Sequence, residues 1–174
     1  MPLLGFAGAV VTRREDHYYN NRPASVRREN YRMACPYFAP TEPLTDATPL
    51  GRVRPPLGVL YRGMCRAGAD QGSAPREDLL EHGCNFGYAR ALCDRLPKDS
   101  GPDAVRFAIG ADDGRRVRIL FAIEKGHLPD SHGRLVYDRK AADWEGIEPR
   151  TVLHEQAQAY LNSYLNAKRG PAAV

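Results

Sequence analysis

A period of two in the apolar residues within 103–140 is the feature that most constrains the fold of this chain. Alternate positions are apolar at 105–109 and again at 117–123, and an Asp-Asp-Gly turn separates the two runs. A period of two places every second side chain on the same face of a strand. The turn residues favour an antiparallel pair. We therefore predict two antiparallel strands, with a third strand at 134–137.

The segment 149–168 has the spacing of an amphipathic helix. Its apolar residues recur at positions that share one broad stripe: Val152, Leu153, Ala157, Tyr160, Leu161, Tyr164 and Leu165. Such a stripe has to be buried against another element. The sequence thus predicts an α+β fold, in which a three-stranded antiparallel meander is covered by this C-terminal helix.

The region before the sheet is rich in proline and glycine from 35 to 72. We expect mainly loop there, because proline and glycine interrupt regular elements. Two short helices are predicted next, at 73–83 and from a capping Asn85 to about Leu96. We expect a basic arm at 1–34 and a single domain at 35–174, with loops and short helices at 35–100 and the sheet and long helix at 101–174.

Four cysteines, Cys35, Cys65, Cys84 and Cys93, lie in or just after the Pro/Gly-rich region. None of them forms a Cys-x-x-Cys pair, whereas structural zinc sites commonly use closely spaced pairs. Dispersed cysteines and a proline directly after Cys35 are more typical of iron–sulfur ligation. We predict that all four bind one [4Fe–4S] cluster, with zinc as the alternative cofactor. The remaining interpretation is four small buried hydrophobic residues without metal.

One distance conflicts with a shared site for Cys84 and Cys93. Nine residues of continuous helix span about 13 Å. Either Cys84 folds back from a loop or the helix that we predict between the two residues is distorted. The same span excludes a disulfide across a straight helix, because bridged Cα atoms lie within about 7 Å.

The function that this site implies is that of a small iron–sulfur protein. It would act in electron transfer or as an accessory subunit of a redox enzyme, so a protein partner is expected. Four cysteine ligands saturate a cluster, which favours electron carriage over catalysis at the metal. Two alternatives stay open: a nucleic-acid-binding module stabilised by zinc or a cluster, and a metal-free structural or interaction protein.

The nucleic-acid alternative depends on the arm at 1–34. Arg13, Arg14, Arg27 and Arg28 are interleaved there with tyrosines, and the whole chain has a net charge of +4 and a pI near 9.0. Arginine beside aromatic residues can bind phosphates and stack on bases. An arm packed on the protein's own surface or on a partner subunit explains the same residues, and we favour that interpretation.

The histidines give weaker signals. His82 precedes Cys84 by two residues and is a candidate second-sphere donor or substitute ligand. His127 and His132 flank a loop and are expected at the surface. His154-Glu155 begins like a zinc-protease helix, but Gln158 occupies the position of the second histidine, so the motif is incomplete.

No apolar run approaches the roughly 20 residues that a membrane helix needs. The first eleven residues are mostly apolar, but no basic segment precedes them and arginines follow closely. We expect a cytoplasmic protein without a membrane partner.

Overall fold

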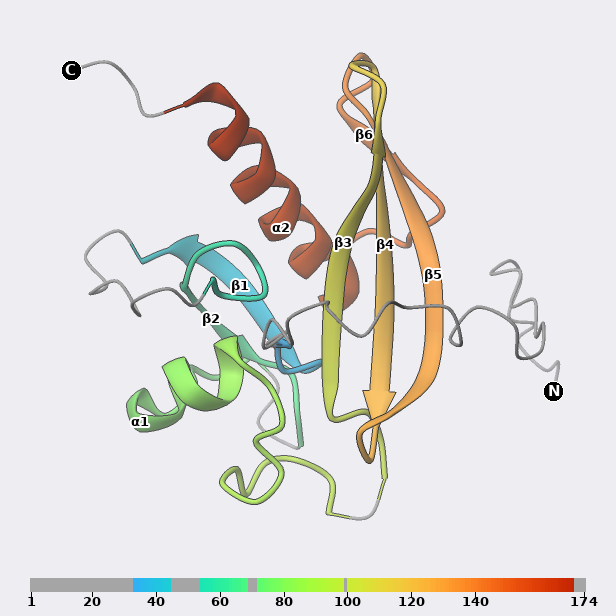
Figure 1. The fold of residues 1–174 in the computed structure, drawn as a ribbon. Helices are drawn as coiled ribbons and strands as arrows, with labels where there is room; N and C mark the ends of the chain where they lie inside the picture. The colour runs from blue at the N-terminus through green and yellow to red at the C-terminus, as the bar shows by residue number, and fades with distance from the viewer. Residues whose placement is uncertain (1–32, 45–53, 69–71, 99, 171–174) are drawn as a thin grey trace, which may run out of the picture.

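The structure, a computed structural model, describes residues 33–44, 54–68, 72–98 and 100–170. It contains two antiparallel sheets, one with two strands and one with four, and a long helix that contacts both (Figure 1). The elements are β1 (Phe38–Pro43), β2 (Tyr61–Cys65), α1 (Glu77–Leu79), the π-helical turn η1 (Leu80–Asn85), β3 (Ala104–Asp112), β4 (Arg116–Lys125), β5 (Leu128–Asp138), β6 (Asp143–Glu145) and α2 (Val152–Arg169). The α+β class fits this arrangement, but the prediction of a single three-stranded meander is wrong.

The larger sheet has the strand order β3-β4-β5-β6 and follows the alternation of the sequence. Val117 and Ile119 of β4 are fully buried against Leu161 of α2. The strand predicted at 134–137 is longer than expected, because β5 begins at Leu128, immediately after the β4–β5 turn. The short strand β6 was missed, since three residues are too few to establish a period.

A second sheet lies in the region where the sequence predicted loop. β1 pairs with β2 in antiparallel register, with Phe38 opposite Cys65 and an irregularity after Pro40. Prolines are compatible with this sheet because both of its strands are edge strands. At Gly63 an added Cβ would lie 2.3 Å from the carbonyl oxygen of Ala39, so the close approach of β1 requires glycine there.

The two helices predicted around Cys84 are replaced by other structure. The first begins later than expected, as α1, and continues as η1 to Asn85. The second is absent, because Gly87 and Tyr88 have φ angles of 65° and 53°, which a right-handed helix cannot include. An added Cβ at Gly87 would lie 2.4 Å from the carbonyl oxygen of Met33, so this position also needs glycine.

Helix α2 begins at a capping Thr151, whose hydroxyl accepts a hydrogen bond from the main-chain N–H of His154. The prediction of a helix at 149–168 is confirmed within a few residues. Gln156 is buried in α2 and donates to the carbonyl oxygens of Cys35 and Phe38, at 2.7 and 2.8 Å. The helix therefore fixes the main chain at the start of β1 as well as covering the larger sheet.

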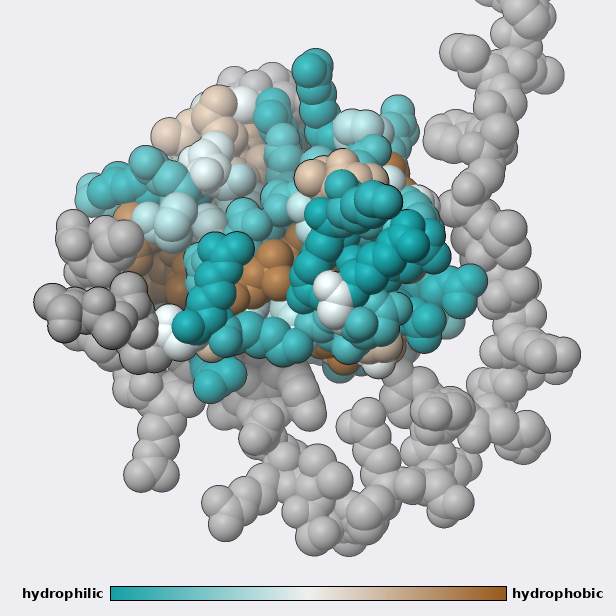
Figure 2. Space-filling view, turned by 90° about the horizontal axis from the view of Figure 1, so that it is seen from above, coloured by the Kyte–Doolittle hydropathy of each residue, from teal (hydrophilic) through white to brown (hydrophobic). Residues whose placement is uncertain are grey.

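Seen from above, hydrophilic residues surround a smaller hydrophobic area (Figure 2). Within the described part of the chain, no helix combines the length and the apolar character that crossing a membrane requires.

Candidate functional site

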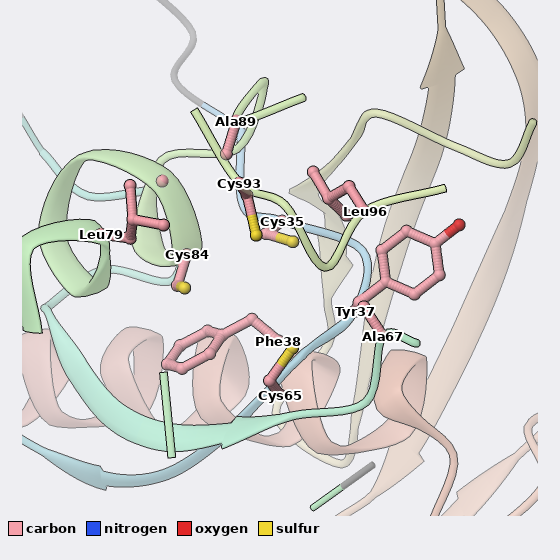
Figure 3. Close-up of a pocket in the computed structure, with 11 residues that line it drawn as sticks. Cys35, Tyr37, Phe38, Cys65, Ala67, Leu79, Cys84, Ala89, Cys93 and Leu96 are labelled. Atoms are coloured by element: carbon pink, nitrogen blue, oxygen red, sulfur yellow. The ribbon is translucent and has the colours of Figure 1, made fainter. Parts of the chain in front are cut away.

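All four cysteines line one small cavity of about 20 Å³ (Figure 3). Each comes from a different segment: Cys35 precedes β1, Cys65 ends β2, Cys84 lies in η1, and Cys93 lies in the turns that follow. The rest of the wall is almost entirely apolar and consists of Tyr37, Phe38, Ala67, Leu79, Gly83, Ala89 and Leu96. Four segments that are far apart in the sequence therefore contribute a cysteine to the same cavity.

Main-chain hydrogen bonds hold these segments together. The N–H of Cys35 donates to the carbonyl oxygen of Cys84 at 2.9 Å, which joins the start of β1 to η1. The N–H of Cys93 donates to the carbonyl oxygen of Ala89 at 2.7 Å. Asn85 is also buried, and its side chain bonds to the main-chain N–H and carbonyl of Tyr61 in β2. Main-chain hydrogen bonds between these segments thus bring the four thiols to one cavity.

The absence of a helix after Asn85 removes the distance conflict between Cys84 and Cys93. Turns connect the two residues, so the straight 13 Å span does not apply. The left-handed residues Gly87 and Tyr88 turn the chain back toward the cavity.

The four cysteines differ in their access to solvent. Cys35 and Cys65 are buried, with 7% and 8% of their surfaces exposed, whereas Cys84 and Cys93 are half-buried. All four are free thiols. The site therefore has two thiols that a small reagent can approach and two that are buried.

Burial controls the protonation of two of these thiols. It raises the pKa of Cys35 to about 12, and the nearby Cys65 and Cys93 add to the rise while main-chain N–H groups oppose it. Burial also raises the pKa of Cys84 to about 12, assisted by the other three cysteines and opposed by the charge of Arg95. At neutral pH both are thiols and not thiolates.

Two arginines lie near the site without lining the cavity. Arg95 bonds to the hydroxyl of Ser73 and the carbonyl of Ala74, at 2.8 and 2.9 Å, and its charge acts on Cys84. Arg76 forms two hydrogen bonds to the carboxylate of Asp78, at 3.1 and 2.6 Å. Sequence analysis missed both arginines, although Arg95 follows Cys93 by two residues.

The arrangement contradicts the predicted cluster. Within the described ranges, no group of three or more His, Cys, Asp or Glu side chains is placed to hold a metal ion. Ligands of a metal must converge on one point, about 2.3 Å from each sulfur in a zinc site, whereas these thiols share the cavity wall with bulky apolar groups. The predicted function, that of a [4Fe–4S] protein, is therefore wrong. The alternative function, that of a nucleic-acid-binding module stabilised by zinc or a cluster, is wrong for the same reason. The two cofactors themselves stay predictions that only a metal assay can decide.

The other predicted site residues lie elsewhere. His82 is not part of the cavity wall, and its side chain is 71% exposed beside Glu81. His127 lies in the β4–β5 turn, where its ring stacks on Tyr88 at 4.2 Å, and His132 is an exposed residue of β5. The arginines Arg13, Arg14, Arg27 and Arg28, and most of the predicted arm, lie outside the described residues.

A polar cluster next to the cysteine loop also escaped prediction. The hydroxyl of Tyr88 donates to Glu124, Arg106 forms an ion pair with Glu124 at 3.5 Å, and Arg90 pairs with Asp103. Burial, and then the hydrogen bond to Glu124, raise the pKa of Tyr88 well above its usual value. These contacts attach the cysteine loop to the larger sheet.

Comparison with protein-family models, curated proteins and solved structures found no match to this chain. The site and the fold are therefore the basis for any functional conclusion.

Proposed function

We propose that this protein responds to oxidants through its cysteines, and that Cys93 and Cys35 are the first pair to form a disulfide. The observation that supports the proposal is that all four cysteines of the chain line one cavity. A metal-free group of thiols in one place has the components of a thiol–disulfide switch.

Accessibility gives the thiols different roles. Cys93 is half-buried and is therefore accessible to a small oxidant. Cys84 is equally accessible, but its raised pKa keeps it protonated and slow. Cys35 is buried, and the charges of Cys65 and Cys93, which line the same cavity, both act on it. It is therefore placed to act as the resolving thiol.

The oxidant that we consider is hydrogen peroxide, and the reaction has two steps. The Cys93 sulfur attacks one peroxide oxygen, which gives a sulfenic acid and releases one water molecule. The Cys35 sulfur then displaces the hydroxyl group, which forms the S–S bond and releases a second water molecule. The two sulfurs lose two electrons in total and the peroxide gains them, so the reaction is balanced.

A disulfide between these residues would change the stability of the fold. It would close a loop of roughly 60 residues, for which chain entropy gives about 4 kcal/mol of stabilisation. The bond would also join the turns around Cys93 directly to the start of β1. Oxidation would thus stiffen the side of the molecule that carries the cavity.

The test counts free thiols in protein that is purified anaerobically, freed of reductant and assayed for iron and zinc. After treatment with a small excess of peroxide, we expect two of the four thiols to be lost and to return with a dithiol reductant. Cys93→Ala should slow this loss at least tenfold, whereas Cys65→Ala should keep it near the wild-type rate. Thermal unfolding of both variants shows whether they fold.

Three results would contradict the proposal. The first is four free thiols after a treatment that fully oxidises glutathione. The second is loss of thiols only between chains, as covalent dimers. The third is iron or zinc bound in stoichiometric amount and protecting the thiols, which would return the site to metal chemistry.

A further inference from the structure

The larger sheet has one face covered by α2 and an opposite face that projects basic side chains. Val117 and Ile119 point toward α2, so alternation along β4 places Arg118 and Leu120 on the opposite side. The strand register sets Leu120 opposite Arg134 and Arg118 opposite Val136. We call the surface formed by Arg118, Leu120, His132, Arg134 and Val136 the outer face.

The outer face combines apolar and cationic groups. Leu120 is 44% exposed although it is a large hydrophobic residue in the middle of a strand. Arg118, Arg134 and His132 around it are all exposed. An apolar centre with arginines beside it is the composition that protein interfaces favour, since arginine is enriched there and lysine is depleted.

The charges of two of these arginines are not neutralised by their surroundings. Arg106, on the same side of β3, is paired with Glu124. Arg118 and Arg134 have no ion pair with a carboxylate anywhere in the ranges that the structure describes. The outer face therefore carries net positive charge, and a ligand that covers Leu120 must also approach two free guanidinium groups.

We propose that the outer face is a docking surface for another protein, one that presents carboxylates around an apolar patch. Charge complementarity selects an acidic partner. The segment 1–32 of this chain does not fit that description, because its acidic residues, Glu15, Asp16 and Glu29, are outnumbered by Arg13, Arg14, Arg22, Arg27, Arg28 and Arg32.

The outer face is poorly suited to single-stranded nucleic acid. Binding of unpaired bases normally uses exposed aromatic rings as stacking platforms. The aromatic side chains of this sheet lie on the other side, where Phe107 and Tyr137 pack into the core beneath α2. A protein partner therefore explains the exposed Leu120 better than bases do.

The test uses the full chain with a photoactivatable amino acid at Leu120, and at Lys140 as a control position, expressed in the source cells. We expect cross-linking from position 120 to one protein, unaffected by nuclease, and none from position 140. The captured protein is then identified, purified and titrated against the unlabelled chain. It should carry an acidic surface patch, and its binding should weaken as salt concentration rises.

Two double variants with the same change in net charge decide whether the outer face carries the binding. Arg118→Glu with Arg134→Glu should weaken the binding of the purified partner about a hundredfold. Lys140→Glu with Arg169→Glu, both exposed and away from the outer face, should leave it within about threefold. Circular dichroism and thermal unfolding confirm that both variants fold.

The proposal is overturned if position 120 captures nothing beyond the control, or if nuclease abolishes the capture, which would indicate a nucleic acid. Equal weakening by the two double variants would also overturn it, because net charge and not the outer face would then be responsible.

Discussion

The two halves of this molecule are built in different ways. The larger sheet and α2 come from contiguous segments whose side-chain period predicts each element, and neighbouring strands are neighbours in sequence. The cysteine region is assembled from four separate segments that are held by main-chain hydrogen bonds, by left-handed residues and by one buried glutamine. The structure of the first half therefore depends on hydrophobic periodicity, whereas the structure of the second depends on a few specific contacts.

The largest expected loss of stability comes from replacing one glycine of the cysteine region, compared with the same replacement in the larger sheet. Gly87→Ala should destabilise the protein by about 3 kcal/mol or more, because its φ is 65° and the new Cβ would collide with the carbonyl of Met33. Gly126→Ala in the β4–β5 turn is the matched control. Its φ is 57° but the space around it is open, so only about 1 kcal/mol should be lost. Urea unfolding measures both, and equal losses would contradict the comparison.

A smaller effect is expected where the two halves are joined. Gln156→Leu keeps much of the volume but removes the donors to Cys35 and Phe38, so we expect a loss of about 2 kcal/mol. It should also make Cys35 easier to label with a thiol reagent. The control Asn162→Ala changes an exposed residue of the same helix and should cost less than about 0.5 kcal/mol. Unchanged labelling of Cys35 would show that Gln156 does not position the site.

Alkaline pH should weaken the cysteine half selectively. The folded protein holds the pKa of Cys35 and Cys84 at about 12, above the ordinary value of 9.0. Their contribution to stability is complete below pH 9 and is lost as pH rises toward 12. Replacing both residues by alanine should flatten the unfolding midpoint across pH 8–11, relative to wild type. A decline of the same steepness in the double variant would assign the effect to other groups.

Acid should weaken the sheet half, and the effect is expected to be smaller because the pKa of one carboxylate, that of Asp138, is displaced less than the pKa values of the two thiols. Hydrogen bonds from the main chain of Ala141 and Lys140, with the charge of Arg115, lower the pKa of Asp138 to about 2. The stability that this carboxylate provides is present above pH 4 and is lost as pH falls toward 2. Asp138→Asn should reduce the acid sensitivity of unfolding while leaving labelling of the cysteines unchanged. A variant with wild-type acid sensitivity would contradict this role.

The sequence predicted the sheet half well for a physical reason. Periodic burial is a local pattern, so β3, β4 and α2 were found nearly at their observed positions. The three-residue strand β6 was missed because so short a strand has no measurable period. The boundary of β5 was misplaced because Gly133 looks like a loop residue, whereas it makes room for the ring of Phe121 on the facing strand.

The site was predicted in part. The sequence led us to place Cys35, Cys65, Cys84 and Cys93 around one cluster, whereas the structure shows only that they line one cavity, because the sequence could not give the direction of their side chains. That direction depends on Gly87, Tyr88 and the pairing of Asn85 with β2, which are long-range features without a local signal. The same features turned a predicted helix into turns and placed apolar groups among the thiols.

The measurement that tests the central claim most directly is peptide mapping of the oxidised protein. Trypsin cleaves after lysine and arginine, so each cysteine lies in a different peptide, at 33–52, 63–66, 77–90 and 91–95. After peroxide treatment and blocking of the remaining thiols, mass spectrometry of the unreduced digest shows which peptides are joined. We predict a link between 33–52 and 91–95 within one chain, reversed by a dithiol reductant. Four unlinked peptides, all carrying the blocking group, would contradict a shared redox site.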